Sequence, residues 1–163
     1  MPQSPNQRAK LLYLMKILLE KTDLQNPMTI SEIIAELAAY NITSERKSIY
    51  TDFEILRQFG LDIETQRSKT TGYYISNRDF ELPELKLLVD AVQSSKLITN
   101  KKSRELIGKL SKLTSAAQAK QLNRQVYVSG RAKAINETVY YSIDAIHAAI
   151  NEGKKNQLQI FQL

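Results

Sequence analysis

Apolar and polar positions in the first forty residues repeat with the spacing of amphipathic helices. Apolar side chains recur at three- and four-residue intervals over residues 11–19, which predicts a first helix over residues 7–21. Pro27 ends this pattern. Thr29 and Glu32 then have the spacing of a capping box, in which each side chain satisfies a free backbone N–H at a helix start. A second helix is therefore expected to begin after Thr29.

A short polar turn separates the second helix from a third. We expect the second helix to end at Tyr40-Asn41, because asparagine adopts a left-handed conformation more readily than most residues. Ser44 is a suitable N-cap for the third helix, and Gly60 is a suitable end. The apolar stripe of the third helix is Ile49, Phe53 and Leu56. Two helices joined by so short a turn are typical of a helix-turn-helix.

The segment after Gly60 has the period of a β-hairpin. Apolar and polar residues alternate over residues 61–66 and again over 73–76, and residues 67–72 between them are polar and end in glycine. A hairpin placed directly after the third helix is the wing of a winged helix-turn-helix. Residues 1–78 are therefore predicted to form three helices plus a β-hairpin wing.

The remainder of the chain is predicted to be mainly helical. One helix starts near Glu81 with Pro83 in its first turn, and a second covers residues 101–122. The expected buried positions of this second helix are Leu106, Ile107, Leu110 and Leu113. Residues 125–128 are expected to form a strand or an extended linker. Ser142 is expected to cap a last helix that ends at Gly153, with Ile143, Ile146 and Ile150 facing inward, and residues 157–163 alternate like one terminal strand.

The fold class is thus predicted as mainly α, a winged helix-turn-helix followed by a helical linker region and one terminal strand. The distribution of charge along the chain supports a domain boundary near residues 78–83. Residues 1–78 have a net charge of +1 and residues 79–95 of −3, whereas residues 96–133 hold ten basic side chains and one acidic one, a net of +9. The basic segment could follow DNA phosphates beside a binding site, or it could be a solvated lysine face or pair with the acidic helix.

The composition excludes several kinds of site. The chain has no cysteine and a single histidine, His147, so it lacks the ligands of a thiolate or multi-histidine metal centre. Its five glycines are isolated, which excludes a glycine-rich phosphate-binding loop. We therefore expect no catalytic residue, no metal site and no cofactor, and we expect that the protein is not an enzyme.

The sequence also bears on location. No stretch approaches the roughly 18–20 apolar residues that cross a bilayer, so no membrane partner is expected. Lys16 interrupts the apolar run near the N-terminus, and no small-residue cleavage site follows it. Together with the lack of cysteine, these features predict a cytoplasmic protein.

The third helix is the main candidate for a binding surface. If its apolar stripe faces the core, a rotation of 100° per residue directs Lys47, Thr51, Glu54 and Gln58 outward. The candidate DNA-binding residues, which can donate to phosphates or base edges, are Thr29, Ser44, Arg46, Lys47, Ser48, Tyr50 and Thr51, with Arg67 and Lys69 in the wing. The alternative interpretation is a solvated helix face and a hairpin that only closes a small core.

Several segments resemble the WYL-domain transcriptional regulators that carry a DeoR-type winged helix at the N-terminus. These segments are Ser44–Asp52 (SERKSIYTD), Phe59–Ile63 (FGLDI), Gly72–Tyr74 (GYY) and Phe80–Leu88 (FELPELKLL), and residues 144–154 resemble the helix that leads into the WYL barrel. The resemblance implies DNA binding through residues 44–51 and the wing, and a tendency to dimerise. It divides the chain into a DNA-binding domain (1–78), a helical linker and dimerisation region (79–136) and the start of a sensor domain (137–163).

The chain departs from this family at its sensor domain. It contains no tryptophan, so the Trp-Tyr-Leu tripeptide is absent, and it ends where the first barrel strand would start. We therefore expect a chain truncated before the WYL barrel, with an unknown effector. The predicted function is a sequence-specific regulator of transcription that binds double-stranded DNA as a homodimer, with the third helix in the major groove. The alternative is a winged-helix module for protein interaction that does not contact DNA.

Overall fold

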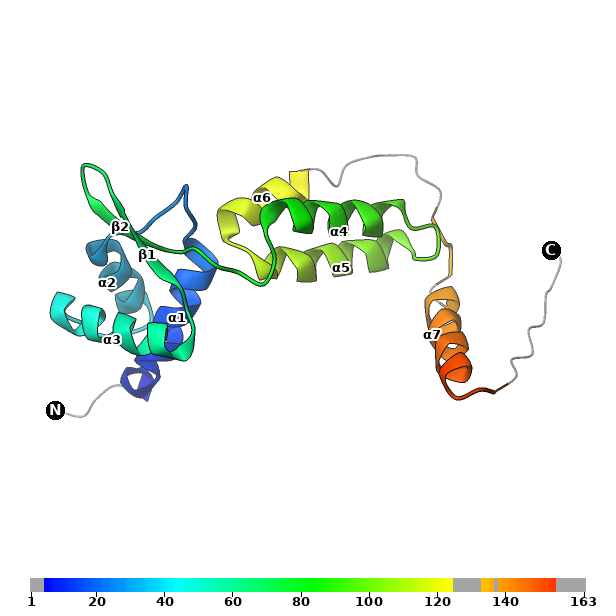
Figure 1. Ribbon diagram of the computed structural model, residues 1–163, viewed down its shortest axis with the longest axis horizontal. Helices are drawn as coiled ribbons and strands as arrows, with labels where there is room; N and C mark the ends of the chain where they lie inside the picture. Colours follow the sequence, from blue (N-terminus) through cyan, green and yellow to red (C-terminus); the bar gives the residue numbers. More distant parts are fainter. Residues whose placement is uncertain (1–4, 125–132, 137, 155–163) are drawn as a thin grey trace.

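The structure is a computed structural model that describes residues 5–124, 133–136 and 138–154. It is mainly helical, with one two-stranded antiparallel sheet in the described residues (Figure 1). The elements in chain order are the 3₁₀ turn η1 (Pro5–Ala9), α1 (Lys10–Lys21), α2 (Ile30–Ala39), α3 (Arg46–Phe59), β1 (Ile63–Arg67), β2 (Thr71–Ile75), α4 (Leu82–Ser94), α5 (Asn100–Leu110), the 3₁₀ turn η2 (Ser111–Leu113), α6 (Ala116–Arg124) and α7 (Thr138–Asn151).

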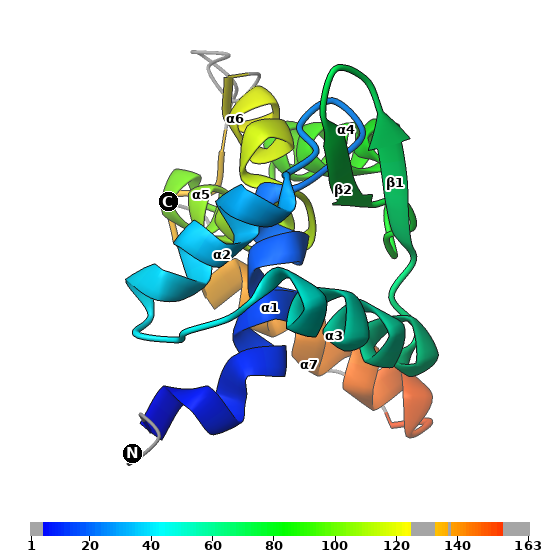
Figure 2. The same cartoon turned by 90° about the vertical axis from the view of Figure 1, so that its left-hand side faces the viewer.

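The first three helices and the hairpin enclose one hydrophobic core. Its buried residues are Leu14, Ile17, Leu18, Ile30, Ile33, Leu37, Ile42, Ile49, Phe53, Leu56, Ile63, Tyr73 and Ile75. The hairpin pairs Ile63 with Ile75 and Arg67 with Thr71, as the alternating pattern predicts. This group of elements lies at one end of the molecule, which Figure 2 views directly.

Local signals set the start and end of α2 and the end of α3. The Thr29–Glu32 capping box is present, with the Glu32 N–H donating to the Thr29 hydroxyl (3.3 Å) and the Thr29 N–H donating to the Glu32 carboxylate (2.7 Å). Asn41 has a left-handed conformation with φ 58°, and Gly60 ends α3 with φ 109°. These three predictions are confirmed, since each depends on backbone groups within a few residues.

Two predicted helix starts within residues 1–78 are wrong. The first helix begins at Lys10 instead of residue 7, because residues 5–9 form a 3₁₀ turn in which the Gln7 side chain donates to the carbonyl of Thr43 (3.0 Å). The N-cap of α3 is Glu45 and not Ser44, because the first helical bond runs from the Ile49 N–H to the Glu45 carbonyl (3.1 Å).

The predicted single helix over residues 101–122 is divided in two. Thr114 is extended, with φ −135° and ψ 178°, and Ser115 starts α6 by accepting from the Ala119 N–H (2.8 Å) with its carbonyl. The Ser115 hydroxyl also accepts from the Gln118 N–H (3.2 Å) and donates to Asp23 in the loop after α1. Because the chain turns here, Leu113 is 40% exposed instead of buried.

The last described helix also starts earlier than predicted. It begins at Thr138, whose N–H donates to the Asn136 side chain (3.0 Å), while Ser142 lies inside the helix. Its predicted end at Gly153 is confirmed by a φ of 65°. Ile150 is 65% exposed instead of inward, since α7 lies apart from the other helices (Figure 1). The strands predicted over residues 125–128 and 157–163 fall outside the described residues.

A second, smaller core holds α4, α5 and α6 together. Leu85, Val89, Ile107 and Leu122 are its buried residues. Two sets of hydrogen bonds connect the segments next to this second core to α1 and the loop after it. One is the Ser115–Asp23 bond, and in the other Arg78, before α4, donates to the carbonyls of Leu19 (2.7 Å) and Thr22 (2.8 Å). Within the described ranges, no helix is both long and apolar enough to cross a membrane.

Candidate nucleic-acid interface

Helix α3 presents one polar face that no other described element covers. Ile49, Phe53 and Leu56 are at most 4% exposed and face the core. The four positions predicted to point outward, Lys47, Thr51, Glu54 and Gln58, are all exposed. The three helices α4, α5 and α6 lie on the side of this unit away from the start of α3 and the turn of the hairpin (Figure 1). The polar face of α3 is therefore open to a large partner.

Four basic side chains of this end are exposed and have no carboxylate partner among the described residues. Arg46 and Lys47 occupy the first turn of α3, and Arg67 and Lys69 lie at the end of β1 and in the turn of the hairpin. By contrast, Lys21 at the other end of α1 pairs with Glu36 (2.6 Å). The unpaired cations make this end of the molecule attractive to an anion.

An ion pair under α3 fixes the helix against α1. Lys10 lies with its Nζ 2.5 Å from Oδ2 of Asp52, and it also donates to the hydroxyl of Ser48 (2.6 Å). The Ser48 oxygen accepts this bond, so its own hydrogen stays available to an outside acceptor. Lys10 and Asp52 were not among the predicted site residues. A signal existed, because each charged residue falls on the apolar stripe of its helix.

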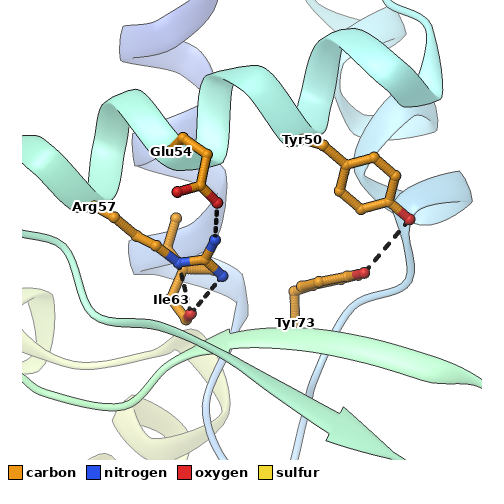
Figure 3. Close-up of polar contacts among 5 residues, drawn as sticks. All are labelled: Tyr50, Glu54, Arg57, Ile63 and Tyr73. Carbon is orange, nitrogen blue, oxygen red and sulfur yellow. Dashed lines mark hydrogen bonds and ion pairs between the residues drawn. The ribbon is translucent and has the colours of Figure 1, made fainter.

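A second polar contact holds the hairpin to α3. Arg57 donates through Nε and Nη2 to the carbonyl of Ile63 (3.2 and 2.9 Å) and through Nη1 to Glu54 (2.5 Å) (Figure 3). This arginine joins the last turn of α3 to the first residue of β1. The Arg57 guanidinium therefore donates to groups of the protein itself and is not a candidate for contact with DNA, although Arg57 lies on the same helix as Arg46.

A chain of two tyrosines connects the hairpin to the first turn of α3. The Arg46 Nε–H donates to the Tyr50 hydroxyl (3.1 Å), and the Tyr73 hydroxyl donates to the same oxygen (3.5 Å); Figure 3 shows the two tyrosines facing each other. The hydrogen bonds from Tyr73 and Arg46 lower the pKa of Tyr50, whereas burial raises the pKa of Tyr73. The hydrogen bond to Tyr50 raises the pKa of Arg46. Sequence reasoning missed Tyr73, which the strand alternation places on the core side.

Two predicted site residues do not present a free hydroxyl to a partner. The Thr29 hydroxyl donates to the Glu32 carboxylate (2.8 Å) and accepts from the Glu32 N–H, so both functions serve the capping box. The hydrogen bonds from the Thr29 N–H and hydroxyl lower the pKa of Glu32. The Ser44 hydroxyl oxygen is buried without a hydrogen-bond partner in the described structure. The remaining predicted residues are Arg46, Lys47, Ser48, Tyr50 and Thr51, which lie together in the first two turns of α3, and Arg67 and Lys69, which lie on the hairpin.

Comparison with known proteins identifies no similar protein. The chain matches no protein-family model, and searches of curated proteins and of solved structures each find no match. What the polar face of α3 binds is therefore inferred from its chemistry.

Proposed function

We propose that the protein is a sequence-specific DNA-binding regulator of transcription whose first 78 residues form a winged helix-turn-helix. The proposal is carried by four exposed basic side chains that have no carboxylate partner in the part of the chain that the structure describes: Arg46, Lys47, Arg67 and Lys69. In this proposal α2 and α3 are the helix-turn-helix pair, and the hairpin is the wing. The protein acts by binding and not as an enzyme.

The side chains divide between two kinds of DNA contact. The exposed first turn of α3 enters the major groove, where Arg46, Tyr50 and Thr51 can reach base edges. Lys47 and the Ser48 hydroxyl are suited to phosphates on the groove wall. Arg67 and Lys69 in the wing reach the backbone or the minor groove beside the same site.

The proposal includes two copies of the chain on one operator. Residues 1–78 have a net charge of only +1, so the winged helix of each copy gains little from general attraction to DNA. Two linked copies whose recognition helices are about 34 Å apart would bind a pseudo-palindrome through their combined affinity. The resemblance to WYL-domain regulators supports the same assembly.

The test is DNA binding by the double variant Arg46→Ala/Lys47→Ala. Neither side chain touches the core, so we expect retention in a gel shift to be lost while the midpoint of thermal unfolding stays nearly unchanged. The matched control is Lys109→Ala/Lys112→Ala, which removes the same charge from exposed positions on α5 and η2 and should bind as the wild type does. Equal retention of the first variant and the wild type would contradict the proposal. A wild-type chain that shows no salt-sensitive binding to DNA would favour the protein-interaction module instead.

A further inference from the structure

We propose that Arg46 reads a guanine in the major groove through its two terminal nitrogens, and that Tyr50 and Tyr73 are positioning residues that aim it. This inference rests on the proposed function and adds the base that the site recognises. It assigns Tyr73, a buried hairpin residue, to the specificity of a helix that lies beside it.

Only one edge of the Arg46 guanidinium is used within the described structure. Its Nε–H donates to the Tyr50 hydroxyl (3.1 Å), and the guanidinium carbon lies 5.7 Å from the centre of the Tyr50 ring. Arginine has five N–H donors, so four remain on the two terminal nitrogens. Because Nε is the atom that is held, these two nitrogens form the free end of the side chain.

Tyr50 is in turn held by a residue that is itself immobilised. Tyr73 is 8% exposed, and its ring packs against Phe53 with the centroids 5.1 Å apart. Its backbone exchanges two hydrogen bonds with Met28 (2.8 and 2.9 Å), which fixes β2 to the loop before α2. The Tyr73 ring meets the Tyr50 ring edge-on at 6.2 Å. The orientation of Arg46 therefore depends on three segments of the fold: α3, β2 and the loop before α2.

Guanine is the base that fits this donor arrangement. It presents two acceptors, N7 and O6, side by side in the major groove, and two parallel N–H groups satisfy both. Adenine presents N7 next to an amino group, so one guanidinium N–H would face another donor. An arginine already held in the required orientation loses less conformational freedom on binding, which raises its selectivity as well as its affinity.

The Tyr50 hydroxyl completes the site. Its oxygen accepts from both Arg46 and Tyr73, so its own hydrogen is left for an acceptor outside the protein. The phosphate 5′ to the guanine or a neighbouring base edge is such an acceptor. Removal of this hydroxyl therefore frees the Arg46 side chain and removes one contact to DNA, whereas removal of the Tyr73 hydroxyl only loosens the support.

The experiment uses the full chain and a randomised duplex library. The best-bound duplex is selected with the wild type, and each of its guanines is then replaced in turn by 7-deazaguanine, which lacks the N7 acceptor but still pairs with cytosine. We expect one guanine in each half-site to lose roughly 5- to 100-fold in affinity on this change. Arg46→Ala removes the guanidinium donors, so it should bind both duplexes more weakly than the wild type does and with nearly equal affinity for the two.

The positioning residues are tested with Tyr50→Phe and Tyr73→Phe against the same pair of duplexes. Both variants keep the ring, so we expect unchanged thermal unfolding but a several-fold smaller discrimination between guanine and 7-deazaguanine. Tyr74→Phe, at the next position of β2, is the matched control and should discriminate like the wild type. Full discrimination by both variants would overturn the role of the tyrosines.

The outcomes separate this inference from the proposed function. If the wild type selects a sequence but Arg46→Ala still discriminates against 7-deazaguanine as the wild type does, Arg46 does not read the guanine and the inference is wrong while DNA binding stands. If the wild type selects no sequence and binds no duplex, the proposed function fails and this inference fails with it.

Discussion

Lys10 and Asp52 form an ion pair that joins the first residue of α1 to the middle of α3. The Nζ and Oδ2 atoms are 2.5 Å apart, and the two side chains are only 11% and 13% exposed. Because both charges are largely removed from water, loss of either partner would leave the other as an uncompensated buried charge. The pair therefore sets where α3 lies, and with it the polar face that carries Arg46 and Lys47.

We expect Asp52→Ala to lower the free energy of unfolding by about 2–3 kcal/mol, because Lys10 is left charged and nearly buried. Urea denaturation followed by circular dichroism measures this change. The control is Glu54→Ala on the same helix, whose pairing with Arg57 is 66% exposed at the carboxylate and should cost less than about 1 kcal/mol. The double variant Lys10→Met/Asp52→Leu should recover most of the loss. A double variant no more stable than Asp52→Ala would show that the charges themselves are required.

Gly72 lies where the hairpin meets the loop before α2. A Cβ at this position would come within 2.7 Å of the Cβ of Pro27, which is closer than such atoms approach. We expect Gly72→Ala to destabilise the fold by about 1–3 kcal/mol, because either the hairpin or the loop has to move. Gly108→Ala is the control, since nothing lies within 4 Å of a Cβ there, and its effect should be small or stabilising. Equal midpoints of thermal unfolding for the two variants would contradict this reading of the contact.

Asp23 makes stability depend on acid pH. Burial raises its pKa, but hydrogen bonds from Ser115, Asn26 and the backbone of Gln25 outweigh this effect and hold the pKa below its usual value. The folded state thus binds the proton less readily than the unfolded state, so the contribution of Asp23 is present above about pH 3.9 and is lost as the pH falls through the folded pKa.

We therefore expect the free energy of unfolding of Asp23→Asn to vary less between pH 5 and pH 3 than that of the wild type. Urea titrations at several pH values measure the difference. Asp90→Asn, an exposed carboxylate on α4, serves as the control for the loss of one negative charge. If the free energy of unfolding of Asp23→Asn and of the wild type varies with pH in parallel, Asp23 does not contribute to the loss of stability in acid.

The wing should contribute to DNA affinity mainly through phosphates. We expect Arg67→Ala/Lys69→Ala to weaken binding to all duplexes and to make the plot of log affinity against log salt less steep by about 2. The preference for the selected sequence should change little, because phosphate contacts carry no base information. Lys109→Ala/Lys112→Ala should leave the slope unchanged. A loss of sequence preference in the wing variant would mean that the wing reads bases.

The sequence by itself determined the features that depend on neighbours along the chain. The capping box of Thr29 and Glu32 and the left-handed ends at Asn41 and Gly60 follow from backbone groups a few residues away. The helical period also predicted which side of α3 faces outward, since the apolar stripe at Ile49 has to be buried. The three helices and the hairpin were predictable for the same reason, although the binding of DNA stays a prediction.

The tertiary structure alone decided which polar groups meet. Ser115 and Asp23 are 92 residues apart in sequence, and their hydrogen bond lies at the break between η2 and α6, where the period of the apolar residues predicted a continuous helix. Tyr73 reaches Tyr50 across 23 residues, and Lys10 reaches Asp52 between two helices. Such contacts depend on the distance between elements after they pack, and hydrophobic spacing contains no information about that distance. The sequence therefore predicted the face of α3 but not the side chains that hold and aim it.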